Sequence, residues 1–542
     1  MAVFFVFLTA LFVTMVLVAV LMKWAQQLHL VDMPDERKVH ARVIPRIGGV
    51  GMVLGFATAV LIWMDVGDDV RGFLSGVLVI SCFGLWDDRA NLDYRLKFAG
   101  QLLAVLIVVF PGSVMIQRLS FGGGETLPEL VSVPLTVLFL LGMTNAMNLS
   151  DGLDGLAAGL SMLSLVCIMA LAVLAEDAGD LLLLAGAIIG ATFGFLRYNT
   201  HPALVFMGDT GSQFLGFSLG VLAIWLTQQE NTAVAAELPL LILGLPIIDT
   251  LNVMTCRMMK GLSPFRPDQN HFHHRLLDLG FDHYEAVLSI YAIQCLFVVS
   301  AYLLRYETGW VILSFYSALF ASIVCFYPLA KRHGWRLRVR GAGHVSLVSK
   351  GIRNLRQQRW LQKVPYACVS YLIIGFLVFG SAVIDEIPTD VGYFALMMIA
   401  VSLVFVWLQL PMATWVQRLG IYTCSILVVY GVESSHVPLM GASEDWAKYF
   451  FVGLAVLIGL GMRYSARYYF SLTPSDFLVM GILLAVAYLP VFQQLNYAKL
   501  AVESAILLYG VEFVLRRQGA PAWLLWGGAT LALAGAGLRA FQ

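Results

Sequence analysis

Two adjacent carboxylates, Asp87 and Asp88, follow the apolar run of residues 76–86. Acidic residues at the edge of a membrane segment usually serve a function, although a pair followed by Arg89 is equally consistent with a solvated helix end. Lys97 follows at the start of the next apolar segment. A lysine there usually extends towards the headgroups, but one that faces two carboxylates can hold a phosphate.

A second motif repeats polar residues every third position. It contains two amides and two carboxylates, namely Asn145, Asn148, Asp151 and Asp154. Residues with this spacing drift by about 60° per step around a regular helix, so they can face one pocket only if the helix breaks. Gly152 and Gly155 allow such a break. Two carboxylates and two amides are hard oxygen ligands suited to Mg²⁺.

Two further motifs can each be interpreted as structural or as functional. Asp209, in residues 206–212, is either a helix N-cap or a metal carboxylate beside an anion-binding helix N-terminus. Three histidines, His271, His273 and His274, precede Arg275. Because no fourth ligand or Cys partner lies nearby and the flanks are cationic, these side chains are better suited to phosphate oxygens than to zinc.

The elements that must position these residues are membrane helices. Of the 542 residues, 59% are hydrophobic and only 13% charged, which excludes a soluble globule. Apolar segments of roughly 15–22 residues recur, as spanning helices require. The seven cysteines show no paired spacing and predict neither disulfides nor a zinc site. The fold class is therefore an all-α polytopic membrane protein, with about eleven spans followed by about seven more.

Charge distribution predicts the topology. Basic residues after the first span place that segment in the cytoplasm, and counting spans onward brings residues 87–97, 145–155, 197–212 and 257–283 to the same side. Every motif above is thus expected at the cytoplasmic face. The densest basic stretch, 331–363, marks a boundary, so we predict a core at 1–330, a cytoplasmic linker at 331–364 and a C-terminal multi-span module at 365–542.

Taken together, the motifs resemble those of a known protein family. They are Asp87-Asp88, Asn145-x-x-Asn148-x-x-Asp151-Gly-x-Asp154-Gly-Leu, Phe206-Met-Gly-Asp209-x-Gly-Ser and Pro267-Asp-x-x-His271-x-His273-His274. This set resembles the polyprenyl-phosphate N-acetylhexosamine-1-phosphate transferases (glycosyltransferase family 4). The His-x-His-His form is similar to the bacterial undecaprenyl-phosphate GlcNAc-1-phosphate transferases rather than to the MurNAc-pentapeptide branch. The resemblance covers roughly residues 1–330, and the later spans have no counterpart in it.

The resemblance implies transfer of N-acetylhexosamine-1-phosphate, best GlcNAc-1-phosphate, from a UDP-sugar to undecaprenyl phosphate, with release of UMP. It also implies Mg²⁺, with Mn²⁺ as the alternative ion. Matched by motif position, the expected roles are as follows: catalytic Asp87, Asp88 and Asp209; metal ligands Asp209 and Asn148; substrate-binding Lys97, Asn145, Asp151, Asp154, His271, His273, His274 and Arg275. Asp87 is a candidate base only, because a lipid phosphate is already largely dianionic near pH 7.

The resemblance also sets the expected context. We expect a multi-pass protein of the bacterial inner membrane that starts a cell-surface polysaccharide such as O-antigen lipopolysaccharide or a cell-wall polymer, with no nucleic-acid partner. A homodimer and recruitment of later polysaccharide enzymes stay open. Competing interpretations are a transporter or lipid-linked sugar flippase and a MurNAc-pentapeptide transferase-like enzyme. For residues 365–542, a scaffold is favoured over a transport role.

Overall fold

The computed structural model describes residues 2–33, 43–120, 126–175, 178–259, 261, 271–337, 359–384, 399, 403, 413–435, 446–464, 473–488, 497–515 and 522–539. The chain divides into two compact units. The first contains Met1–Gly341 and Thr473–Ile482, and the second contains Ala342–Leu472 and Leu483–Gln542. The division at residue 341 falls inside the predicted linker. Residues 473–482, which the sequence places in the C-terminal module, group with the first unit.

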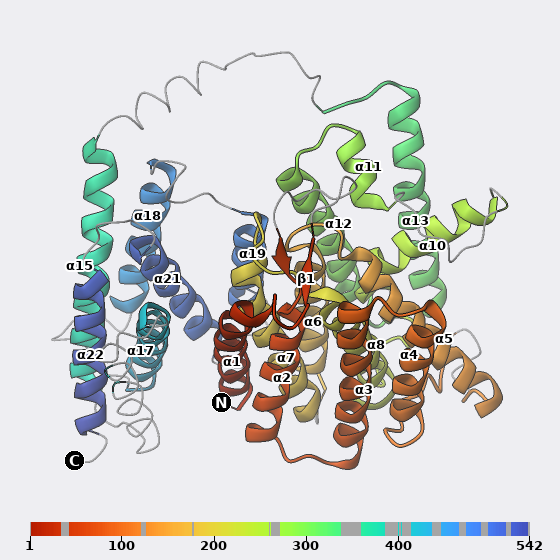
Figure 1. Ribbon diagram of the computed structural model, residues 1–542, viewed down its shortest axis with the longest axis horizontal. Coiled ribbons are helices and arrows are strands. Elements are labelled where there is room, and N and C mark those ends of the chain that lie inside the picture. Colours follow the sequence, from red (N-terminus) through yellow and green to blue (C-terminus); the bar gives the residue numbers. More distant parts are fainter. Residues whose placement is uncertain are drawn as a thin grey trace. The chain divides into compact units, whose positions relative to one another are not determined.

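The described part of the first unit is a helical bundle (Figure 1). Its elements are α1 (Ala2–Trp24), β1 (Val31–Asp32), β2 (Ile44–Pro45), α2 (Gly48–Trp63), α3 (Asp68–Ala90), α4 (Tyr94–Val109), α5 (Glu129–Ser150), α6 (Leu156–Ala172), α7 (Gly179–Asn199), α8 (Gly208–Trp225), the π-helix η2 (Leu226–Glu230), α9 (Pro239–Ile242), α10 (Gly244–Met259), α11 (Phe272–Asp278), α12 (His283–Leu303) and α13 (Gly309–Arg332). β1 and β2 form a short antiparallel pair.

The helices described in the second unit's part of the chain are α15 (Arg359–Val383), α17 (Ala413–Ser435), α18 (Trp446–Tyr464), α19 (Pro474–Tyr488, which begins in the first unit), α21 (Tyr497–Leu515) and α22 (Ala522–Arg539). Among the described residues, eight helical segments are long and apolar enough to span a membrane, seven of them in the first unit, and shorter apolar helices accompany them. The prediction of an all-α polytopic membrane protein is confirmed.

Helix α8 lies at the centre of the first unit. It packs against α5, α3 and α2, and its residues from Thr210 to Trp225 are buried throughout. A helix that is apolar on every side is typical of such a position. Aromatic rings fill its contacts with α2 and α3, including Phe214 against Phe56 at 5.4 Å and Phe217 stacked on Phe73 at 6.2 Å between ring centroids. The site motif that begins α8 is therefore held by a rigid element.

Small residues let α3 and α2 approach the start of α8 closely. A Cβ atom on Gly84 would lie 2.7 Å from the Thr210 Cα, and one on Gly49 would lie 2.2 Å from the Gly211 nitrogen. Because lipid tails are as apolar as the side chains, membrane helices associate largely through close packing of this kind. These contacts fix the end of α3 against the N-terminus of α8.

The loops gather at two opposite ends of the bundle, and the predicted site motifs share one of them. At that end, Gly155 N donates to Asn199 Oδ1 and Phe206 N donates to Pro45 O; β1 and α11 lie there too (Figure 1). At the other end, Gln228 Oε1 accepts hydrogen bonds from the Gln117 and Arg118 nitrogens. The grouping of loops expected from counting spans is present in the structure.

Candidate active site

Asp88 caps helix α8. Its carboxylate accepts hydrogen bonds from Asp209 N at 2.7 Å, Thr210 N at 3.0 Å and Thr210 Oγ1 at 2.7 Å. The side chain is buried, with 7% of its surface exposed. A carboxylate in this place satisfies N–H groups that the helix itself cannot pair and complements the positive end of its dipole. Asp88 was predicted to be catalytic, and the structure gives it a positioning contact to α8.

The approach of Asp88 depends on Gly208. The Gly208 φ angle is +67°, and a Cβ atom there would lie 2.5 Å from both Asp88 carboxylate oxygens. A residue other than glycine would be strained by the backbone angle and would also displace the carboxylate. Glycine is therefore required directly before Asp209.

Asp209 lies in the first turn of α8 but is not its cap. The N-cap residue is Met207, and Asp88 supplies the capping oxygens. Asp209 is thus not the cap of this helix, and its role as a functional carboxylate stays a prediction. Its side chain is 29% exposed.

Lys97, in the first turn of α4, joins two of the predicted carboxylates. Its Nζ lies 2.9 Å from Asp87 Oδ2 and also forms an ion pair with Asp209 Oδ2. Asp87 Oδ1 accepts a hydrogen bond from Leu92 N at 2.7 Å, which holds the turn between α3 and α4. The alternative in which Lys97 extends towards the lipid headgroups is therefore wrong for this structure, because the ammonium group faces the carboxylates.

The two asparagines at the end of α5 have different surroundings. The Asn148 amide nitrogen donates to Asp209 Oδ1 at 3.0 Å and to Ser212 Oγ at 2.8 Å, which leaves its carbonyl oxygen for a cation. The Asn145 amide nitrogen donates to Gln101 Oε1 at 2.9 Å and to the Leu141 carbonyl at 2.8 Å. Asn148 thus belongs to the carboxylate cluster, while Asn145 lies one turn away beside Gln101.

The helix break predicted for residues 145–154 follows directly after α5. Helix α5 ends at Ser150 and α6 begins at Leu156, and Gly155 has a φ angle of +78°. In the intervening loop, burial and the nearby carboxylates of Asp209, Asp154 and Asp88 raise the pKa of Asp151 to about 7. Negative charge is therefore in excess around this loop.

Asp154 is held differently. Its Oδ2 lies 2.6 Å from His201 Nδ1 and accepts a hydrogen bond from Ala203 N at 3.0 Å. Burial alone would raise the pKa of this carboxyl group, but the hydrogen bonds from His201 and the Ala203 nitrogen lower it overall. Asp154 is ionised at neutral pH.

The histidine motif is anchored by α10. His271 Nδ1 lies 2.9 Å from Asp249 Oδ2, and Phe272 N donates to Asp249 Oδ1 at 2.8 Å. Burial and the neighbouring His274 lower the pKa of His273 to about 3, so this imidazole is neutral near pH 7. It can offer a hydrogen bond to a phosphate but no charge.

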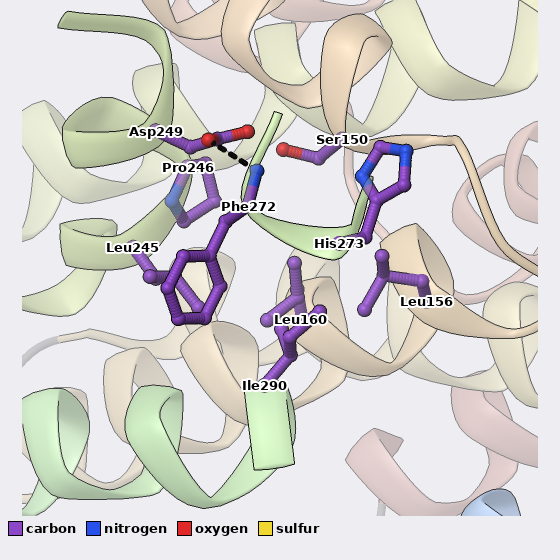
Figure 2. Close-up of a pocket in the computed structure, with 9 residues that line it drawn as sticks. All are labelled: Ser150, Leu156, Leu160, Leu245, Pro246, Asp249, Phe272, His273 and Ile290. Atoms are coloured by element: carbon purple, nitrogen blue, oxygen red, sulfur yellow. Dashed lines mark hydrogen bonds between the residues drawn. The ribbon is translucent and has the colours of Figure 1, made fainter. Parts of the chain in front are cut away.

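Gly152 connects the histidine motif to the carboxylate cluster. A Cβ atom there would lie 2.4 Å from His273 Nε2, so the ring packs directly on the loop backbone. His273 and Ser150 also border a small pocket between α5, α6, α10 and α11, where the Asp249–Phe272 hydrogen bond closes one side (Figure 2). The motifs from α3, α4, α5, α8 and α11 therefore form one continuous site.

Sequence reasoning missed several residues of this region. Asp249 and Asn252 are polar residues inside an apolar run, a signal that could have been used. Asn252, with its amide oxygen facing Arg275, accepts hydrogen bonds from that guanidinium at 2.7 and 3.2 Å, and the Arg275 guanidinium also lies over the Tyr327 ring. Residues 262–270, which contain the predicted Pro267-Asp part of the motif, lie outside the described residues.

The cluster fits a hard divalent cation. Asp87, Asp88, Asp151 and Asp209 converge with Lys97 as the ammonium between two of them. Anionic substrates could not approach such an excess of carboxylates without further positive charge. Carboxylate and amide oxygens are the ligands that Mg²⁺ prefers. Asp209 and the Asn148 oxygen are the best placed to hold it.

Fold and site together define a class of protein: a polytopic helical membrane protein with a cluster of carboxylate, ammonium and amide side chains at one end of its bundle. The family model for glycosyl transferase family 4 matches residues 70–227, which contain Asp87, Asp88, the motif of residues 145–155 and Asp209. The histidine motif lies beyond that match.

Curated relatives extend the similarity. A probable undecaprenyl-phosphate N-acetylglucosaminyl 1-phosphate transferase of Bacillus subtilis is 37% identical over 314 residues, which cover 56% of this chain and 85% of the relative. A decaprenyl-phosphate N-acetylglucosaminephosphotransferase of Mycolicibacterium smegmatis is 37% identical, covering 48% and 71%. The undecaprenyl-phosphate alpha-N-acetylglucosaminyl 1-phosphate transferase of Escherichia coli K12 is 28% identical, covering 62% and 91%. The chain belongs to glycosyl transferase family 4.

Proposed function

We propose that this protein transfers N-acetylglucosamine-1-phosphate from UDP-N-acetylglucosamine to undecaprenyl phosphate, giving undecaprenyl-diphospho-N-acetylglucosamine and UMP. The observation that carries the proposal is the convergence of Lys97 and Asn148 on Asp209 at the exposed end of a buried helix, with Asp87 paired to the same Lys97. Family membership and the names of the relatives support the same reaction.

The reaction joins two anions. An oxygen of the lipid phosphate attacks the β-phosphorus of the nucleotide sugar, the bond from that phosphorus to the bridging oxygen breaks, and UMP leaves with the electron pair. Bound Mg²⁺, held by Asp209 and Asn148, would supply positive charge that lowers the repulsion between the phosphates. Since the lipid phosphate is largely dianionic near pH 7, the attack needs no strong base.

The chain's own residues align the reactants. The Lys97 ammonium, held by Asp87, can bind a phosphate oxygen while a quarter of its side chain stays exposed. Asp88 fixes the turn that carries Asp209. Neutral His273 and the Arg275 guanidinium provide hydrogen-bond donors for the pyrophosphate. Positioning and charge neutralisation are the main contributions expected of a phosphoryl-transfer site.

The surroundings suit a lipid acceptor. Trp86, Phe98 and Leu149 directly neighbour Asp87, Lys97 and Asn148 in the chain, and they are 50%, 50% and 38% exposed. Exposed apolar side chains beside a polar site are appropriate where a polyprenyl tail enters from the bilayer. Basic flanks on this end favour a cytoplasmic orientation in the bacterial inner membrane, where the product would start a cell-surface polysaccharide.

The test is UMP release from membranes supplied with Mg²⁺, undecaprenyl phosphate and UDP-N-acetylglucosamine. Asp209→Asn should lower turnover at least about 100-fold and raise the Mg²⁺ concentration needed for half-maximal rate. The matched control is Asp93→Asn, an exposed residue whose side chain makes no helix-cap hydrogen bond. Wild-type protein that releases no UMP with this donor or other UDP-N-acetylhexosamines would reject the proposal, and so would an unaffected Asp209→Asn variant.

A further inference from the structure

A second cluster of ligand-type side chains lies beside the proposed transferase site. Asp154, His201 and His283 come from three segments: the loop after α5, the loop between α7 and α8, and the first turn of α12. One ligand atom from each lies within 4.8 Å of the other two. Asp154 was expected to bind substrate, whereas His201 and His283 belong to none of the motifs described above.

One ring nitrogen of His201 faces the carboxylate directly, since Nδ1 lies 2.6 Å from Asp154 Oδ2. An ion bound by both groups would take the place of the proton that they share. The two rings are stacked, with centroids 3.9 Å apart and planes 23° apart.

His283 Nε2 provides the second observation. It is buried and has no hydrogen-bond partner. Leaving a buried polar nitrogen unsatisfied costs about 1–3 kcal/mol, so a bound group that pairs with it is favoured. The Asp154 carboxylate also has a spare acceptor, because the His201 and Ala203 hydrogen bonds both go to Oδ2.

We propose that Asp154, His201 and His283 bind a divalent transition-metal ion such as Zn²⁺, separately from the Mg²⁺ proposed at Asp209. Two imidazoles and a carboxylate are a donor set for Zn²⁺, Co²⁺ or Fe²⁺, whereas Mg²⁺ prefers oxygen ligands alone. Ligands at the Zn–N and Zn–O distances of a tetrahedral site lie roughly 3.3 Å apart, so binding would draw the three ligand atoms together and turn the two stacked rings until a nitrogen of each faces the ion. Three protein ligands leave one coordination position open.

Such an ion would join the segments that carry the transferase motifs. Asp154 ends the loop that contains Asp151, and His201 precedes the turn that leads to Asp209. The ion would therefore hold three segments in a fixed arrangement: this loop, the connection from α7 to α8, and the start of α12. The inference does not require the proposed reaction, since it concerns binding alone.

The test uses the purified full-length protein in excess Mg²⁺, with Co²⁺ as the spectroscopic probe and Zn²⁺ as competitor. We expect one Co²⁺ per chain with visible d–d absorption, displaced by Zn²⁺. His201→Gln and His283→Gln should each weaken binding by at least about 100-fold, whereas Asp209→Asn and the exposed His333→Gln should bind as the wild type does. Equal binding by the wild type and both histidine variants would overturn the proposal.

Two further measurements distinguish this site from the His271–His274 motif and from misfolding of a variant. His273→Gln should retain the Co²⁺ signal, and loss of the signal in that variant alone would assign the ion to the His271–His274 motif instead. X-ray absorption of the Zn²⁺-loaded wild type needs no variant that could misfold. It should show two imidazole ligands with oxygen ligands, and a shell without imidazole would overturn the proposal.

Discussion

Replacing Asp88 by Asn tests whether this residue acts by positioning helix α8. Asp88 accepts three hydrogen bonds, two of them from Thr210 and one from Asp209 N. An asparagine has a single acceptor oxygen. If that oxygen faces Thr210, the amide NH₂ group faces the Asp209 N–H, and one of the three bonds is lost.

The magnitude follows from these contacts. A hydrogen bond to a charged group is worth about 1.5–3 kcal/mol, and the two remaining bonds fall to about half their strength without the charge. The lost interaction with the helix dipole adds about 0.3–2 kcal/mol. These contributions amount to about 3–8 kcal/mol. Because asparagine does not bury a charge, the desolvation cost of Asp88 is relieved and offsets part of this loss. We therefore expect a destabilisation in the lower part of that range, about 3–5 kcal/mol, which is large against a typical total of about 5–15 kcal/mol. Because Asp209 moves with the N-terminus of α8, a shift of about 1 Å should lower turnover at least about 100-fold.

The assay combines UMP release with the thermal unfolding midpoint in detergent, and Asp93→Asn is the matched control. Thr210→Val removes only the hydroxyl bond to Asp88 and should give a smaller loss of about 1.5–3 kcal/mol in the same direction. Turnover of Asp88→Asn within threefold of the control would refute the reasoning. So would a large loss of turnover with an unchanged midpoint, because that result would indicate direct contact with substrate.

Two further predictions follow from the site. His273→Gln should raise the apparent KM for the nucleotide sugar. Because the His273 pKa falls from 6.5 to about 3 on folding, the wild type should lose stability by up to about 1.4 kcal/mol per pH unit as pH falls from 6.5 towards 3. When unfolding midpoints are compared at about pH 7.5 and about pH 5, the His273→Gln variant should lack this loss, whereas His333→Gln should keep it. Truncation after Lys363 removes none of the site residues described above, so lipid- and Mg²⁺-dependent UMP release should stay detectable. Correctly inserted but inert truncated protein would mean that later residues, among which Thr473–Ile482 group with the first unit, complete the site.

The sequence determined the class of fold and most of the site's composition. Apolar segments of spanning length can satisfy their backbone hydrogen bonds in lipid only as helices or closed barrels, and basic flanks ordered the loops into two sets. Hard oxygen ligands in Asn148 and Asp209 indicated a cation and phosphates. The polar spacing of residues 145–154 predicted a helix break, which the structure has between Ser150 and Leu156.

Only the tertiary structure decided which side chain does what. Whether Asp209 caps its helix or turns its carboxylate towards Lys97 depends on Asp88, which lies 121 positions away, and no local pattern records that contact. The direction of the Lys97 ammonium depends likewise on α3 and α8 packing around α4. Asp249 and the His201–His283 pair entered through contacts between distant segments. Sequence specifies helices through local periodicity and hydropathy, whereas the pairing of polar groups inside the bundle depends on how closely those helices pack.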